Sequence, residues 1–359
     1  MGRIKAWITL IFQMGPIAGV AKQFETLNRF FVLNTLKLEG LFDFISSPQT
    51  YKEILDHFKY EDSKYTRDLL EIIRNDRNKI VIYSEEDKTF KRNPSAKLPE
   101  LKDLLSVRSF ERIYQASKVP QKFAQNIPNR LRGESKGFAE DLKEPGPSLF
   151  DYNEALTHKL YTAMRNSAFA FIDTNSLLGK KILDVGCGAG RETAELWIKF
   201  KGQSKIVGVD PVESFIETAK SQFSSILQET IQIVAKNKIL PDLTEENHPE
   251  FYNMPAEDLQ FDDASFDVAF LQQILHWTSD AKKAISEISR VLKPGGMFFG
   301  SQGTLPLNTP YMDIMIRAHE KVIGFFSLED LKKWIEEANL IGFERTTPAG
   351  IFKVYKKQS

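Results

Sequence analysis

The sequence has little of what several protein classes require. Its only cysteine is Cys187, which excludes disulfides within one chain and cysteine-rich metal sites, and which favours a reducing, cytoplasmic compartment. Its 5 histidines lack the spacing of zinc ligands, so no metal site is predicted. The 48 basic residues balance 48 acidic ones, so net charge draws the chain toward neither nucleic acid nor anionic lipid.

An apolar run near the start, residues 6–21, is too short for a membrane span. Its 16 residues fall below the roughly 20 that cross a bilayer, and Gly15 with Pro16 would break a helix in its middle. The basic flank and small residues also fit a secretory signal. We expect a helix that packs on a dimer partner, with peripheral membrane contact through residues 4–22 as an alternative.

Residues 1–96 predict a mainly helical domain. Apolar residues recur at helical spacing over 29–45, and two shorter helices are expected at 50–58 and 63–75. Residues 79–93 then alternate as two strands around a polar turn, which is typical of a hairpin. Three helices and a hairpin predict a winged helix. Acidic residues on its third helix and at its wing tip would repel phosphates, so dimerisation is favoured over DNA binding.

The remaining chain predicts a connector and a second domain. Residues 97–147 are charged, helix-favouring and interrupted by prolines, as expected of a helical connector. The second domain, 148–359, begins with a long amphipathic helix that reaches residue 175. Two aromatic residues on that helix, Tyr152 and Tyr161, either cover a substrate pocket or pack in the core.

The stretch "ILDVGCGAG", residues 182–190, joins a buried strand to a helix at 191–200. Glycine is required in such a turn because a Cβ would collide with a ligand or forbid the backbone angles. The next strand, 204–211, ends in Asp210, which lies 20 residues beyond Gly190. That spacing matches an acidic residue that reaches the ribose hydroxyls of a nucleoside cofactor at the carboxyl edge of a parallel sheet.

The turn differs from a dinucleotide-binding loop in two respects. Its pattern is Gly-x-Gly-x-Gly rather than Gly-x-Gly-x-x-Gly, and Asp184 precedes it. A carboxylate there would repel a pyrophosphate but would attract an ammonium or a sulfonium. These residues favour S-adenosylmethionine over NAD, and a cytosolic metabolite as cofactor disfavours secretion.

With these residues the chain resembles the class I S-adenosylmethionine-dependent methyltransferases over about residues 150–359. Four motifs in order carry the resemblance: "ILDVGCGAG", "VGVDP", "MPAEDLQFDDASFDVAF" and "ISRVLKPGGMFF". The resemblance implies an α/β fold with a Rossmann-like seven-stranded sheet, preceded here by the winged-helix domain. The last strands are expected at 343–350 and 351–357, after a helix with a capping box at Ser327 and Asp330.

The resemblance also implies a cofactor site. Asp184 would lie near the methionyl ammonium, and Asp210 would hold the ribose. Residues 256–258 would flank adenine, where Pro255 stands in place of an acid that the family often has, so that backbone amides or Glu257 must bind the base. The residues predicted to bind the cofactor are Asp184, Gly186, Cys187, Gly188, Gly190, Asp210, Pro211, Ala256, Glu257 and Gln272.

His276 is the candidate catalytic residue. Its position resembles that of the catalytic histidine in O-methyltransferases that combine a winged-helix dimerisation domain with this fold, although Trp277 here is one residue closer than in that pattern. The alternatives are a general base and a residue that shapes the substrate site. Further candidates for substrate contact are Tyr152, Tyr161, Gln273 and Trp277. Residues 232–250 exceed the usual link between two strands and predict an extra helix or a lid.

The sequence thus predicts a methyltransferase for a small, largely apolar acceptor. O-methylation is favoured, with C- or N-methylation as alternatives, and the enzyme is expected to be a cytoplasmic homodimer. No Asn-Pro-Pro-Tyr segment follows the fourth strand, which disfavours amino methylation of nucleobases. The alternative from another class is a transcription regulator whose winged helix binds DNA and whose second domain senses S-adenosylmethionine.

Overall fold

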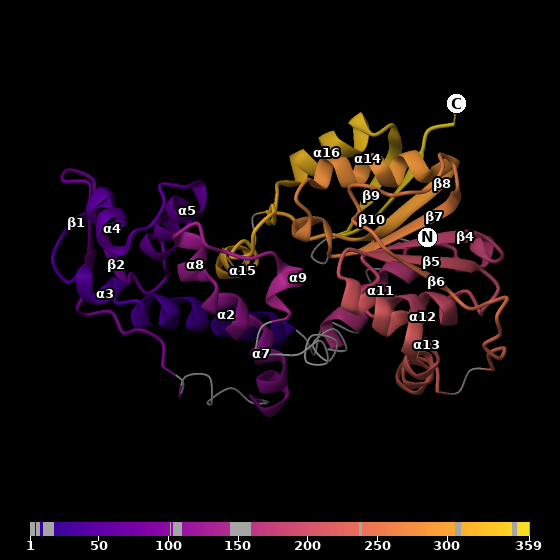
Figure 1. Cartoon of the computed structure of the whole chain (residues 1–359), viewed down its shortest axis with the longest axis horizontal. Helices are drawn as coiled ribbons and strands as arrows, with labels where there is room; N and C mark the ends of the chain where they lie inside the picture. The colour runs from indigo at the N-terminus through magenta and orange to yellow at the C-terminus, as the bar shows by residue number, and fades with distance from the viewer. Residues whose placement is uncertain are drawn as a thin grey trace. The chain divides into compact units, whose positions relative to one another are not determined.

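The computed structural model describes residues 18–100, 110–143, 159–236, 239–305, 310–346 and 350–358, with isolated positions 4, 8, 9 and 102. The chain divides into two compact units (Figure 1). Described residues between 18 and 143 form one unit together with 310–324, and those of 159–305 and 325–358 form the other. The first unit extends past residue 96, because the predicted connector packs with the first helices, and the expected boundary at 147 lies outside the described residues.

The second unit is built on a seven-stranded mixed sheet, which confirms the predicted α/β fold. Its strand order is β6-β5-β4-β7-β8-β10-β9. The first five are parallel, whereas β10 runs antiparallel to both β8 and β9. The strands are β4 (Lys181–Val185), β5 (Lys205–Asp210), β6 (Glu250–Asn253), β7 (Phe266–Gln272), β8 (Leu292–Ser301), β9 (Leu340–Arg345) and β10 (Ile351–Lys356).

Helices cover both faces of this sheet (Figure 1). Side chains alternate along β4, so that Ile182 packs in the core beneath one layer of helices and Leu183 packs beneath the other. One layer holds α11 (Lys159–Ala170), α12 (Arg191–Lys199) and α13 (Glu213–Val234), and the other holds α14 (Ala281–Val291) and α16 (Leu328–Glu337). The capping box predicted at Ser327 and Asp330 is confirmed at the start of α16.

The other unit is mainly helical. The expected helix at 29–45 is two helices, because Gly40, at φ 87°, lies between α2 and α3 in a left-handed conformation. The predicted hairpin is confirmed, and its strands pair with a short third strand in the order β1-β3-β2. The elements are α2 (Ala18–Leu38), α3 (Leu41–Phe44), β1 (Gln49–Thr50), α4 (Tyr51–Phe58), α5 (Lys64–Arg74), β2 (Val81–Ser84), β3 (Thr89–Arg92), α7 (Phe110–Gln125), α8 (Ile127–Leu131), α9 (Phe138–Asp141) and α15 (Pro310–Ile316).

A segment from the second half of the chain, residues 310–324, packs within this helical unit. The Tyr311 hydroxyl donates to the buried carboxylate of Asp76, which also forms two hydrogen bonds with Arg29 at 2.6 and 2.8 Å. Arg317 forms an ion pair with Asp68 at 2.7 Å. The chain therefore leaves the sheet after β8, adds a helix to the other unit and then returns.

The described part of the long link at 232–250, which leaves out 237–238, forms neither the predicted extra helix nor a lid. Helix α13 continues to Val234, and residues 239–249 contain no helix. The indole of Trp197 donates to the carbonyl of Asn247 at 3.0 Å. Trp197 is in the last turn of α12, which begins at the carboxyl end of β4 and therefore ends at the opposite edge of the sheet. The link thus packs away from the edge where a cofactor would bind.

The apolar start of the chain falls largely outside the described residues, since 5–7 and 10–17 are not among them. The dimer-packing helix and the membrane contact through residues 4–22 therefore stay predictions. Within the described part of the chain, no helix is both long enough and apolar enough to cross a bilayer.

Candidate active site

The predicted site residues come together at the carboxyl edge of the parallel strands. In a doubly wound sheet the loops that follow neighbouring strands meet at this edge. The turn at 186–190 follows β4, Asp210 ends β5, and Gln272 ends β7. A Cβ placed on Gly186 would lie 2.6 Å from the side chain of Ile274, so the turn after β4 directly contacts the segment after β7.

The three glycines of this turn have positive φ angles, but their surroundings differ. At Gly186 (φ 76°) the Ile274 side chain leaves no room for a Cβ, and a Cβ on Gly190 (φ 93°) would lie 3.3 Å from the Cβ of Ala219. Gly188 (φ 54°) has no atom within 4 Å of the position a Cβ would take. Packing within the protein therefore explains two of the glycines, and the third faces open space that a ligand can occupy.

The amides of this turn are already hydrogen-bonded within the protein. The N–H groups of Gly186 and Cys187 both donate to the Val209 carbonyl, at 2.8 and 3.0 Å. The N–H of Gly188 donates to the Asp210 carboxylate at 3.1 Å. A phosphate-binding loop instead presents such amides to its ligand. This arrangement therefore supports the preference for a cationic cofactor over a pyrophosphate.

Asp210 supports the turn from the end of β5. Its second carboxylate oxygen accepts from the Val212 N–H at 2.9 Å. Burial raises its pKa to about 6, although both amide hydrogen bonds oppose that shift. The predicted ribose contact of Asp210 is untested, and the adjacent Pro211 is exposed.

Asp184 is fully buried at the end of β4. One carboxylate oxygen accepts from the Thr193 hydroxyl at 2.6 Å, and the other, Oδ1, has no hydrogen-bond partner among the described residues. Burial raises the pKa of Asp184 to about 7, with the Thr193 hydrogen bond opposing the shift. A buried acceptor without a partner is uncommon in folded proteins. The residues present therefore fit a ligand that brings a positively charged donor.

Two further buried carboxylates, which the sequence did not reveal, belong to Glu192 and Glu195, and Glu192 is close enough to Asp184 for their charges to interact. Arg165 of α11 forms ion pairs with Glu192 at 3.1 Å and with Glu195 at 2.9 Å. Burial raises the pKa of Glu192 to about 8, and Arg165 opposes that shift. The carboxylates thus outnumber the cation that contacts them. Glu192 lies in the first turn of α12 and Glu195 in the next turn. Neither gave a signal in the sequence, because exposed glutamates are common near helix starts.

One carboxylate oxygen of Glu257, the predicted adenine ligand, is already hydrogen-bonded within the protein. Its Oε1 accepts from the Ser279 N–H at 2.7 Å and from the Ser279 hydroxyl at 2.9 Å, just before α14. Ala256 is buried beside it. The N–H of Asp258 is also bonded, to the Pro255 carbonyl at 3.2 Å, so of the two alternatives for adenine recognition the backbone one falls to the amides of Ala256 and Glu257.

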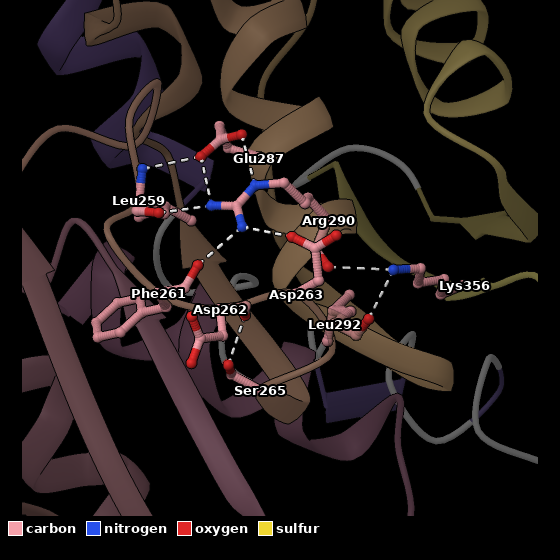
Figure 2. A network of polar contacts seen from close by, with 9 residues as sticks. All are labelled: Leu259, Phe261, Asp262, Asp263, Ser265, Glu287, Arg290, Leu292 and Lys356. Atoms are coloured by element: carbon pink, nitrogen blue, oxygen red, sulfur yellow. Dashed lines mark hydrogen bonds and ion pairs between the residues drawn. The ribbon is translucent and has the colours of Figure 1, made fainter.

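Figure 2 shows how the link that follows this segment is held against α14. The Arg290 guanidinium donates to the carbonyls of Leu259 and Phe261, at 2.6 and 2.8 Å. It also pairs with Asp263 at 2.8 Å and with Glu287 at 2.9 Å. Glu287 in turn accepts from the Leu259 N–H at 3.0 Å. These contacts fix the link between β6 and β7 and so position the adjoining residues 256–258.

His276 lies in a short 3-10 helix, η3 (Leu275–Trp277), and is buried. Its Nδ1 is 3.1 Å from the side-chain amide of Gln302, and its ring stacks on Phe325 with centroids 4.2 Å apart. Burial lowers the pKa of His276 to about 3. So weak a base removes protons poorly near neutral pH. Of the two alternatives, this environment favours the one in which His276 shapes the substrate site.

The remaining candidates are Gln272, predicted to bind the cofactor, and those predicted to contact the substrate, which are Tyr152, Tyr161, Gln273 and Trp277. Gln272 is buried, its amide donates to the Tyr161 carbonyl at 3.2 Å, and its Oε1 has no partner within the described residues. Gln273 accepts from the Gly303 N–H at 2.9 Å. The Trp277 ring lies 5.8 Å from that of His276, and Tyr152 falls outside the described residues. Gln302 was not among the predicted residues, although a polar residue directly after a predicted strand indicates a position at the carboxyl edge of the sheet.

Comparison with known proteins agrees with this geometry. A family model described as a methyltransferase domain matches residues 183–300. An O-methyltransferase from Aspergillus nomiae is 30% identical over 174 residues, which cover 48% of this chain and 69% of that protein. A demethylmenaquinone methyltransferase from Staphylococcus epidermidis is 29% identical over 179 residues, which cover 48% of this chain and 66% of that protein. The chain thus spans about two thirds of the length of these relatives.

Solved structures share the fold over almost the whole chain. The carbon methyltransferase CurJ has a TM-score of 0.68 at 14% identity, with 98% of both chains covered. An O-methyltransferase from Planctomyces limnophilus has a TM-score of 0.51 at 15% identity, with 96% of both chains covered. Taken with the sequence matches, these likenesses show that the chain belongs to the class I S-adenosylmethionine-dependent methyltransferases, with S-adenosylmethionine as its methyl donor.

Proposed function

We propose that the chain transfers the methyl group of S-adenosylmethionine to a small, largely apolar acceptor, by O-methylation in the first place, with C- or N-methylation as alternatives. The observation that carries the cofactor assignment is Asp184, whose buried Oδ1 lacks a partner among the described residues while further carboxylates lie beside it. The cofactor supplies a methyl group on a positively charged sulfur. Asp184 would accept from its ammonium, Asp210 would hold the ribose, and the amides of Ala256 and Glu257 would bind adenine.

The acceptor class is proposed from the neutral side chains after β7 and β8. Gln273 and His276 carry no charge near neutral pH, and Phe325 adds an apolar ring. Charged acceptors would lack an ion-pair partner among these side chains, whereas a flat apolar molecule could stack on such rings. The names of the relatives, O-methyltransferase and demethylmenaquinone methyltransferase, support a small-molecule acceptor.

We propose further that the three helices and the hairpin of the helical unit form a winged helix that serves dimerisation in the cytoplasm. The basic side chains of α5 support this over DNA binding, because each is paired with a carboxylate. Arg67 contacts Asp62 at 2.6 Å, and Arg74 contacts Glu85 at 2.6 Å. Such pairs leave little positive charge for phosphates. Sedimentation should give a dimer, and retention on duplex DNA that weakens with salt would favour the regulator instead.

The acceptor can be found by labelling. Purified protein is incubated with metabolite extracts and S-adenosylmethionine that carries a deuterated methyl group, and mass spectrometry detects products shifted by the label. Calorimetry with S-adenosylmethionine, S-adenosylhomocysteine and NAD tests the cofactor separately. We expect heat from the first two ligands alone; binding of NAD with no response to either adenosyl compound would contradict the proposal.

A further inference from the structure

The hydrogen bonds of Gln302 determine which nitrogen of His276 carries the proton. Gln302 Oε1 accepts from the Leu275 N–H at 3.1 Å, and its Nε2 donates to the Gly303 carbonyl at 2.9 Å. A backbone N–H only donates and a backbone carbonyl only accepts, so these two contacts fix the orientation of the amide. The second hydrogen on Nε2 is then available to His276 Nδ1, 3.1 Å away. Nδ1 therefore accepts, and the imidazole carries its hydrogen on Nε2.

The surroundings keep this imidazole neutral. Three described side chains contact the ring: Trp277 from η3, Gln302 directly after β8, and Phe325. None of them titrates. Burial alone lowers the pKa of His276, without a contribution from any charged group among the described residues. His276 is 2% exposed, and its one hydrogen bond among the described residues is the contact of Nδ1 with Gln302. The hydrogen on Nε2 is therefore left for a ligand to accept.

We infer that His276 acts as a fixed hydrogen-bond donor rather than a base, and that Gln302 is the positioning residue that holds it in this state. The methyl acceptor is then a hydroxyl or enol acidic enough to ionise in water. The inference rests on the proposed methyl transfer and deepens it by naming the acceptor's chemistry. The oxyanion of such an acceptor would accept a hydrogen bond from the Nε2–H group. Donors placed at a buried oxyanion stabilise it strongly because little water competes for it.

The reaction balances without a protein base. The acceptor first gives its proton to water; its electron pair then forms a bond to the methyl carbon as the bond from that carbon to sulfur breaks, and the released pair stays on sulfur. An unactivated alcohol would require proton removal during transfer. In the part of the chain that the structure describes, no carboxylate contacts His276 to assist such a removal. The site therefore selects acceptors that ionise unaided.

The protonation of His276 is directly measurable. The full chain, labelled with nitrogen-15 in its histidines and saturated with S-adenosylhomocysteine, is titrated by NMR from about pH 5 to 8, with His276→Gln to assign the signals. We expect Nε2 protonated and Nδ1 unprotonated throughout. Gln302→Glu has nearly the same shape but only accepts, so it should move the hydrogen to Nδ1 and bring the titration of His276 into this range. A wild-type His276 that titrates near its ordinary pKa of about 6.5, or that lacks the Nε2 hydrogen, overturns the inference.

Acceptor chemistry provides the second readout. For the acceptor found by labelling, and with S-adenosylmethionine kept saturating at every pH, kcat/KM of the wild type for the acceptor should fall about tenfold per pH unit below the acceptor's own pKa, because only its anion reacts. An acceptor at an unactivated alcohol, or a midpoint that belongs to the enzyme whichever acceptor is used, overturns the inference. The signal of His248, which packs on Phe223 in the same unit as Gln302, reports whether Gln302→Glu is folded. Calorimetry separates the two proposals: failure to bind S-adenosylhomocysteine refutes the methyltransferase function, whereas binding with the wrong tautomer refutes only the role of His276.

Discussion

At the scale of single residues, the buried carboxylates couple cofactor binding to protons. The pKa of Asp184 is raised from its ordinary 3.8 to about 7, and that of Asp210 to about 6, in both cases mainly by burial. Between about pH 4 and these values the folded chain binds more protons than the unfolded chain, so these groups make the free energy of unfolding fall as pH rises through that range. A cationic ligand favours the ionised form, so affinity for S-adenosylmethionine should rise over about the same range.

Thr193 allows this coupling to be tested. Its hydroxyl lowers the pKa of Asp184, so Thr193→Val should raise that pKa and weaken S-adenosylmethionine binding by up to about tenfold near pH 6, for a shift of about one unit. Thr193→Ser keeps the hydroxyl and is the matched control. Calorimetry in two buffers with different ionisation enthalpies measures both affinity and released protons. Binding of wild type near pH 6 without proton release would show that Asp184 is already ionised.

At the scale of elements, the turn between β4 and α12 combines backbone strain with a ligand-facing position. Gly188 and Gly179 share a positive φ, of 54° and 75°, and neither has an atom within 4 Å of the position that a Cβ would take. Alanine in that backbone region costs roughly 1 to 2 kcal/mol. The two glycines therefore differ in what lies in front of them rather than in the strain of their backbones.

Gly188→Ala and Gly179→Ala form a matched pair on this basis. Both should lower the free energy of unfolding by about 1 to 2 kcal/mol, measured by urea denaturation. Only Gly188→Ala should also weaken S-adenosylmethionine binding, by about tenfold or more, because its methyl group enters the open space at the turn. Equal affinities for the cofactor in the two variants would place the cofactor elsewhere.

Local patterns predicted elements well, and contacts between distant segments account for what they missed. The hairpin, the capping box of Ser327 and the strand ends at Asp184 and Asp210 each depend on neighbours in the sequence. The requirement for glycine at 186, beside Ile274, and the capture of Glu257 by Ser279 depend on packing between loops that are far apart in the chain. The link at 232–250 misled for a related reason, since its length gave no information about which edge of the sheet it follows.

At the scale of the whole molecule, a buried ion pair stabilises the helical unit. The Asp76 carboxylate forms an ion pair with Arg29 and accepts a hydrogen bond from the Tyr311 hydroxyl. The side chains of Asp76 and Arg29 are almost fully buried. Asp76→Ala would leave Arg29 buried without its carboxylate and should cost about 3 to 5 kcal/mol. Glu85→Ala removes an exposed partner of Arg74 in the same unit and should cost less than about 1 kcal/mol.

Urea denaturation followed by circular dichroism compares these variants, and cofactor affinity below the transition shows whether the sheet unit remains intact. Because the units can unfold separately, two transitions are acceptable, and the first would shift in Asp76→Ala alone. Similar midpoints for both variants would mean that the Arg29 side chain reaches water once its partner is removed.

The segment at 310–324 decides how this protein can be dissected. Tyr311, Ile314 and Met315 are each 2% exposed or less, in a helix whose packing partners precede residue 144 in the sequence. A shortened polypeptide that begins at residue 159 would retain this helix and expose its apolar face to water, and self-association would follow. Workers who seek a minimal catalytic fragment must therefore excise two stretches of the gene and bridge the second gap with a short polar loop.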